Sequence, residues 1–218
     1  MIDLWVPGRN LHLPPPRAEE FGKTGFIQAI VELGVWDRRH RMLRQFREPS
    51  RSPVKQLLQH ILVSFAALTS LANVKDTGGT NRTIQRQFTD GTSTSYMYAT
   101  GTSLGIQVGT GSTAVDILDY VLATAIANGS GAGQLVYQAL TYDADVTVAD
   151  PICTFIVYRN FNNNSGGQIT VAETGFYCST RDTGGTAQTF CLFRDVPTSV
   201  AVPDGGGCYV KYTLQISE

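Results

Sequence analysis

The most regular hydrophobic pattern in the chain lies just after residue 52. Ser52 and Pro53 provide an N-cap and a proline at the first helical position. Apolar residues then recur at the i, i+3, i+4, i+7 spacing of one helix face: Val54, Leu57, Leu58, Ile61, Leu62, Phe65 and Leu68. This pattern predicts one amphipathic helix over about 53–72.

Most of the remaining chain is patterned for strands. Residues 26–36 and 42–46 partly alternate between apolar and polar side chains around a polar turn, which predicts a hairpin. Residues 114–127 place apolar side chains on one helix face and predict one or two further helical turns. Short apolar runs between Gly, Asn, Thr and Asp clusters predict eight strands: Thr83–Phe88, Ser95–Ala99, Leu104–Val108, Leu135–Tyr142, Ile152–Tyr158, Gln168–Tyr177, Thr189–Phe193 and Cys208–Ile216. The fold class indicated is mainly β, an antiparallel, jelly-roll-like β-sandwich with one amphipathic helix.

The first 25 residues differ from the rest. They contain Pro7-Gly8, Pro14-Pro15-Pro16, Gly22 and Gly25. These residues exclude a helix and favour polyproline or irregular backbone. We therefore predict an extended N-terminal arm over 1–25, followed by a single β-sandwich domain over 26–218 that contains the helix.

Composition narrows the class of protein. The chain has 218 residues, of which 42% are hydrophobic and 16% charged, and its formal net charge is -1. These values argue against intrinsic disorder and against a basic nucleic-acid-binding protein. The longest apolar stretch, residues 61–71, is shorter than the roughly 20 residues that cross a bilayer. The N-terminus shows no signal-peptide pattern, so we expect synthesis in the cytoplasm. From the short apolar stretch we expect no membrane partner, and from the near-zero net charge we expect no nucleic-acid partner.

Charge is distributed unevenly. Residues 1–60 hold 10 Lys/Arg against 6 Asp/Glu, and the remainder holds 7 against 12. The basic excess gathers between Arg38 and Lys55, where arginines can pair with carboxylates of a neighbouring subunit; an ordinary solvated hairpin is the alternative reading. The candidate interface residues in the arm and on this basic face are Trp5, Arg9, Arg17, Arg38, Arg39, Arg41, Arg44, Arg47 and Arg51.

Two glycine-rich motifs resemble enzyme signatures. Residues 101–105 match the G-x-S-x-G nucleophile elbow, but a strand is predicted after Ser103 where a helix is needed, and all three histidines precede it. Residues 109–114 match G-x-G-x-x-A, but no acidic strand end follows about 20 residues later, as a dinucleotide fold requires. We therefore predict no catalytic residue and no cofactor, although a hydrolase using Ser103 or a carboxylate pair stays an alternative to be tested.

The sequence also contains no recognisable metal-binding motif. Asp143, Asp145 and Asp150 lack the glycine and glutamate that complete a calcium-binding EF-hand loop. The three histidines and four cysteines show no zinc-ligand spacing. We predict no metal site and free thiols.

Glu173 is a charged residue within a mostly apolar strand. It either faces outward or is a buried partner of Arg194 or Arg159. We favour the outward-facing position, because buried carboxylates are rare.

Several segments share strand patterns with one group of proteins. They are Arg51–Leu58 (RSPVKQLL), Leu104–Thr110 (LGIQVGT), Asp119–Gly129 (DYVLATAIANG), Tyr158–Gly166 (YRNFNNNSG), Ile169–Tyr177 (ITVAETGFY), Leu192–Val202 (LFRDVPTSVAV) and Tyr209–Ile216 (YVKYTLQI). They resemble structural proteins of tailed-bacteriophage virions, in which such strands complete a β-sandwich.

This resemblance implies a non-enzymatic component of a phage virion, an accessory protein of the capsid, neck or tail. We expect it to be a homo-oligomer that contacts copies of itself and other virion proteins through its N-terminal arm and basic face. The alternative is a receptor- or glycan-binding β-sandwich module that uses loops Asn162–Gly167 and Asp182–Thr186.

Overall fold

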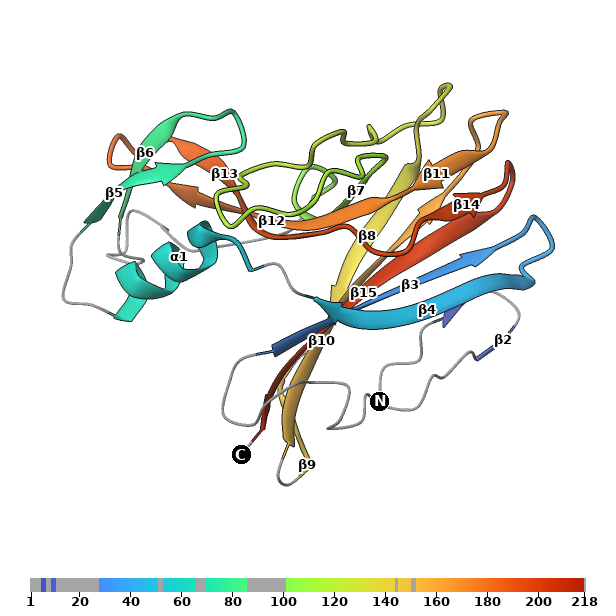
Figure 1. The fold of residues 1–218 in the computed structure, drawn as a ribbon, viewed down its shortest axis with the longest axis horizontal. Coiled ribbons are helices and arrows are strands. Elements are labelled where there is room, and N and C mark those ends of the chain that lie inside the picture. The colour runs from blue at the N-terminus through green and yellow to red at the C-terminus, as the bar shows by residue number, and fades with distance from the viewer. Residues whose placement is uncertain are drawn as a thin grey trace. The chain divides into compact units, whose positions relative to one another are not determined.

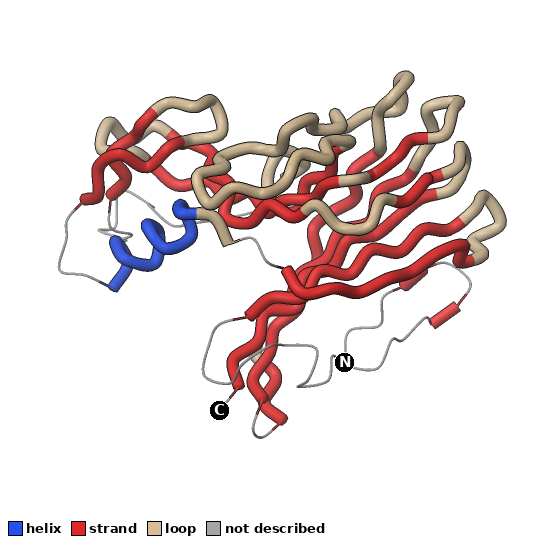
Figure 2. Tube along the Cα trace, in the orientation of Figure 1, coloured by secondary structure: helices blue, strands red, loops and turns tan. Residues whose placement is uncertain are grey.

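The computed structural model describes residues 5–6, 9–10, 28–50, 53–65, 70–85, 101–143, 145–149 and 152–217. In this part of the chain every pairing between named strands is antiparallel, and α1 (Lys55–Phe65) is the one helix (Figures 1 and 2). The predicted class, mainly β and antiparallel with a single helix, is confirmed. None of the described helical segments is long and apolar enough to cross a bilayer.

The chain divides into two compact units. Unit 1 contains Met1–Arg51, Ile126–Val171 and Pro197–Glu218, and unit 2 contains Ser52–Ala125 and Ala172–Val196. Each unit is therefore assembled from segments distant in sequence. A single domain over 26–218 stays a prediction.

Unit 1 is built on a six-stranded sheet with the order β4-β3-β15-β10-β8, in which β9 also pairs with β10. The strands are β3 (Gln28–Trp36), β4 (Met42–Ser50), β8 (Val136–Tyr142), β9 (Thr147–Ala149), β10 (Ile152–Asn162) and β15 (Gly207–Ser217). The predicted hairpin is confirmed, because β3 and β4 pair directly. Two short strands in the predicted arm, β1 (Trp5–Val6) and β2 (Arg9–Asn10), pair with each other.

One face of this sheet is the core face of unit 1. Leu33, Val210 and Arg159 lie opposite one another on β3, β15 and β10, and all three are fully buried. A second sheet, β11 (Ile169–Val171) with β14 (Val200–Val202), lies over this face (Figure 1). The two layers form a small sandwich, because alternate side chains of each strand point into the space between them.

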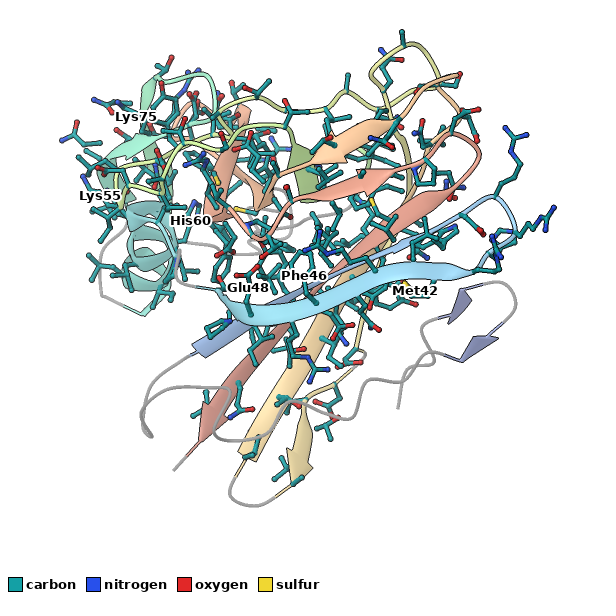
Figure 3. The ribbon with its side chains drawn as sticks, turned by 45° about the vertical axis from the view of Figure 1, so that its right-hand side comes forward. Met42, Phe46, Glu48, Lys55, His60 and Lys75 are labelled. Carbon is teal, nitrogen blue, oxygen red and sulfur yellow. The ribbon has the colours of Figure 1, made fainter. Side chains whose placement is uncertain are left out.

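Unit 2 contains a three-stranded sheet, a two-stranded sheet and α1. The first is β13-β12-β7, formed by β7 (Gly105–Gly109), β12 (Glu173–Arg181) and β13 (Ala187–Asp195); the second pairs β5 (Ser70–Lys75) with β6 (Asn81–Gln85). Figure 3 labels His60 on α1. Its ring is buried and meets Phe190 edge-on at 5.0 Å between centroids, and burial lowers the pKa of His60 to about 4.

Four predicted elements differ from the structure. The helix does not reach residue 72, since residues 70–75 form β5 and the left-handed φ of Asn73 (60°) cannot continue a helix. Residues 114–127 contain no helix, because their backbone groups bind side chains of the sheet, as described below. The strand predicted over 168–177 is two strands in different sheets. The Asn- and Gly-rich composition of residues 161–167 predicts a hairpin loop, but this loop joins β10 to β11, which do not pair. The strand predicted at 95–99 lies outside the described residues.

Candidate interaction surface on the β3–β4 hairpin

The tip of the β3–β4 hairpin is held by one carboxylate. Asp37 accepts hydrogen bonds from the backbone N–H groups of Arg39 and Arg41, both at 2.9 Å, and from the Arg41 Nε at 2.8 Å. The pKa of Asp37 lies below its usual range, chiefly because the backbone N–H of Arg41 donates to it, and also because the other donors do. His40 adopts the left-handed φ of 55° that closes the turn. An Asp at the start of a turn is the sequence signal that predicts such hydrogen bonds from the turn backbone to its carboxylate.

Three candidate arginines project from this tip. The side chains of Arg38 and Arg41 are 74% and 69% exposed, and Arg39 is exposed as well. Arg38 pairs with Asp204 at 3.1 Å and Arg41 with Asp37 at 2.7 Å. Ion pairs between solvent-exposed side chains are weak, because water and salt screen the charges. The guanidinium groups can therefore exchange these partners for carboxylates or phosphates of another molecule.

The other two described arginines of the basic face differ from each other. Arg44 is exposed, donates to the backbone carbonyl of Ser199 at 3.3 Å, and lies 5.9 Å from the Phe46 ring centroid. Arg47 has a side chain only 10% exposed and pairs with the fully buried Glu32 at 3.0 Å. Arg47 therefore belongs to the interior of unit 1, and Arg44 extends the exposed group. Figure 3 shows the course of β4 between these positions through the labels on Met42, Phe46 and Glu48.

The remaining candidate interface residues are those of the predicted arm and Arg51. Trp5 pairs with Asn10, and Arg9 pairs with Val6, in the β1–β2 ladder. Arg17 and Arg51 lie outside the described residues.

Glu32 is the centre of a buried charge cluster on the face of the sheet opposite the core face. Arg47, Glu32 and Lys211 are directly opposite one another on β4, β3 and β15, and Lys211 Nζ lies 2.8 Å from the Glu32 carboxylate. The Tyr209 hydroxyl also donates to Glu32, and the Gln45 amide donates to Tyr209. Burial alone would raise the pKa of Glu32, but its cationic and hydrogen-bonding partners lower it overall. The cluster connects β4, β3 and β15 and keeps the Glu32 carboxylate ionised.

Gly34 is required by this cluster. A Cβ at Gly34 would overlap the ring of Tyr209, which crosses the β3 backbone on its way to Glu32. The absence of a side chain at this position lets the hydroxyl reach the carboxylate.

Glu173 is the corresponding centre in unit 2, and the outward-facing position predicted for it is wrong. Its side chain is fully buried. One carboxylate oxygen accepts from the backbone N–H groups of Gly111 (3.1 Å) and Thr124 (2.6 Å). The other accepts from the N–H of Ala123 (3.0 Å) and twice from the Arg194 guanidinium, at 3.0 and 3.1 Å. Five N–H donors thus surround the group, which leaves it no free lone pair for acid–base chemistry.

Arg194 extends the same network into the loop at 110–125. It donates to Asp119 at 2.7 Å and to the carbonyl of Thr113 at 3.0 Å. Burial alone would lower the pKa of Arg194, but its bonds and charge interactions with Asp119 and Glu173 raise it overall. The loop is fastened to the sheet by side chains, which replaces the helical hydrogen bonds predicted for this region.

The glycine motif at 109–114 is explained by this network. A Cβ at either Gly109 or Gly111 would collide with the Glu173 carboxylate. The glycine loop therefore does approach an anion closely, as such loops do in phosphate sites, but the anion belongs to the chain itself. The prediction that this loop holds no cofactor remains open.

The other chemical motifs are ordinary turns. Ser103 lies in a turn that leads into β7, with a strand rather than a helix after it. Asp143 and Asp145 accept from the backbone N–H groups of Ile156 and Val146, both at 2.7 Å, and position 150 lies outside the described residues. Within the described ranges no three His, Cys, Asp or Glu residues gather closely enough to hold a metal ion.

Both loops of the alternative binding module hold themselves in place. The Asn163 amide is buried and donates to the carbonyls of Gly167 and Val202, both at 2.8 Å. Asp182 accepts from the N–H groups of Gly184 (3.0 Å) and Thr186 (2.9 Å). These polar groups shape the loops and are not directed outward toward a ligand.

Comparison with known proteins adds no family: no family model, curated protein or solved structure matches the chain.

Proposed function

We propose that this chain is a non-enzymatic structural component of a phage virion, an accessory protein of the capsid, neck or tail. It makes intersubunit contacts through its N-terminal arm and its basic face. The observation that carries the proposal is the hairpin tip, where Asp37 fixes the backbone and Arg38, Arg39 and Arg41 remain exposed. A rigid projection with three cations binds an acidic neighbour at a low cost in conformational entropy.

Two further observations support this function. The resemblance of seven segments to tailed-phage structural proteins supplies the class of assembly. The most deeply buried carboxylates, Glu32 and Glu173, are each saturated by donors and cations within their own unit. Carboxylates held in this way make a rigid scaffold, as an assembly component needs.

The first experiment asks whether the chain enters particles. Virus particles are purified from the culture that produces the chain and analysed by mass spectrometry, which should detect it at a fixed ratio to the other particle proteins. Arg38→Glu combined with Arg39→Glu should reduce that ratio at least tenfold, while Arg41 stays to hold Asp37. Lys55→Glu combined with Arg181→Glu reverses the same charge at exposed positions of unit 2 and should leave incorporation unchanged.

Two results would oppose the proposal. If the chain is absent from purified particles, it is not a virion component. If both double variants enter particles at the wild-type ratio, the hairpin tip is an ordinary solvated surface. Deleting residues 1–25 tests the arm independently, and a shortened chain that still assembles normally would remove the arm from the proposal.

A further inference from the structure

The core face of the unit 1 sheet continues into a region where it is exposed. Val157 on β10 and Tyr212 on β15 are paired, buried core residues. Two residues further along β10, Phe155 lies on the same face and pairs with Leu214. In Figure 1 this end of the sheet, where β9 pairs with β10 and where β15 ends, extends beyond the part that β11 and β14 cover.

The exposed end is apolar in two successive rows. Val148 on β9, Cys153 on β10 and Ile216 on β15 lie directly opposite one another, so their side chains share the core face. Phe155 and Leu214 form the next row. The large hydrophobic side chains exposed at this end are Tyr142 (59%), Val146 (53%), Val148 (71%), Phe155 (40%) and Ile216 (55%). We name these five residues the sheet-end apolar face.

The size of this face approaches what a stable contact requires. Together the five side chains expose on the order of 500 Å², at the upper end of the patches that monomeric proteins leave in water. One partner in a standard stable interface buries about 800 Å². Cys153 and Leu214 of the same two rows are partly exposed and can supply part of the rest.

The charges around the face favour a second copy of the same chain over a charged partner. Neither row contains a charged residue, so two identical faces can meet without repulsion or buried ions. Two described carboxylates, Asp143 and Asp145, precede β9 and accept hydrogen bonds from backbone N–H groups. A two-fold contact is self-complementary by construction and is the commonest symmetry of protein oligomers.

We infer that the sheet-end apolar face is a self-association surface, on which a second copy of this chain packs face to face as one sheet packs on another. The exposed rows then extend the core that β11 and β14 begin. This inference is independent of the proposed virion function, because it concerns the purified chain alone.

The test measures the mass of the purified full chain by light scattering after size exclusion and by sedimentation, across the micromolar concentration range. The wild-type chain should form a dimer. Val148→Lys combined with Ile216→Lys should weaken the dimer at least a hundredfold. Leu58→Lys combined with Leu118→Lys is the matched control, because these apolar residues of unit 2 are equally exposed (64% and 63%). It should dimerise like the wild type, and circular dichroism should show that both variants are folded.

Two further readouts separate this face from the basic hairpin. An apolar contact persists when sodium chloride is raised to about 0.5 M, whereas screening weakens a contact made by surface charges. Arg38→Glu combined with Arg39→Glu should leave the dimer intact. Alkylation of Cys153, which lies between Val148 and Ile216 in the first row, should slow as the protein concentration rises through the dimerisation range.

Three outcomes overturn the inference. The first is a wild-type chain that stays monomeric throughout the range. The second is a dimer that survives Val148→Lys with Ile216→Lys. The third is a dimer that dissociates with salt or with the two hairpin substitutions, which would place the contact on the basic face instead. Failure of virion incorporation with an intact dimer would count only against the proposed function.

Discussion

Glu173→Gln is the substitution for which the structure makes the sharpest prediction. All five hydrogen bonds at this carboxylate come from N–H donors. A glutamine in either amide orientation would place its own NH2 group against at least two of them. Arg194, with a side chain only 2% exposed, would also lose one of its two carboxylate partners.

The expected cost follows from this geometry. Removing one partner of a buried ion pair destabilises a protein by about 3–5 kcal/mol, because the other charge stays buried. For a chain of this size that corresponds to a fall in Tm on the order of 10 °C. Asp182→Asn makes the same chemical change at a partly exposed turn carboxylate, where water can replace the lost hydrogen bonds, and should cost about 1 kcal/mol or less.

Two assays check the prediction. Urea unfolding should show the lower midpoint for Glu173→Gln and a nearly unchanged one for the control. Hydrogen exchange should show faster exchange at the amides of Gly111, Ala123 and Thr124, which bind the carboxylate directly. A Glu173→Gln chain with the wild-type midpoint and unchanged protection at these amides would refute the reasoning, since the carboxylate would then not hold the loop.

Three further predictions concern other buried groups. Gly34→Ala should destabilise the chain by about 1–3 kcal/mol through overlap with the crossing ring, while Gly167→Ala, where a Cβ meets open space, should be neutral or slightly stabilising in urea unfolding. His60 has a lowered pKa in the folded chain, so the unfolded chain binds the proton first as pH falls. The free energy of unfolding is therefore unaffected by this group above about pH 6.5 and falls by about 3 kcal/mol toward pH 4. His60→Gln should flatten that part of the stability–pH curve; parallel curves for the wild type and His60→Gln would contradict the assignment. Under native conditions at low protein concentration, a thiol reagent followed by mass spectrometry should modify Cys153 first and the three buried cysteines only on unfolding, because burial raises their pKa; equal rates would disprove it.

Local patterns were sufficient for the elements whose causes are local. Alternation around a polar turn predicted the β3–β4 hairpin, and a proline followed by apolar i, i+3, i+4 spacing predicted the start of α1. The basic character of the hairpin could be read in the same way. These features depend on neighbours in sequence, so the sequence alone was enough to find them.

What each face meets was decided only by the tertiary structure. Arg38 and Arg47 are both arginines of the predicted basic face, yet Arg38 projects into water and Arg47 is buried beside Glu32. Glu173 turns inward because the loop at 110–125 brings N–H donors to it, and the helical period of that loop is overridden. The strand predicted over Ile152–Tyr158 is part of β10, but its pattern did not show that the apolar side at Phe155 would be left uncovered. Periodicity tells which side chains share a face; only the packing of distant segments determines whether protein or water lies against it.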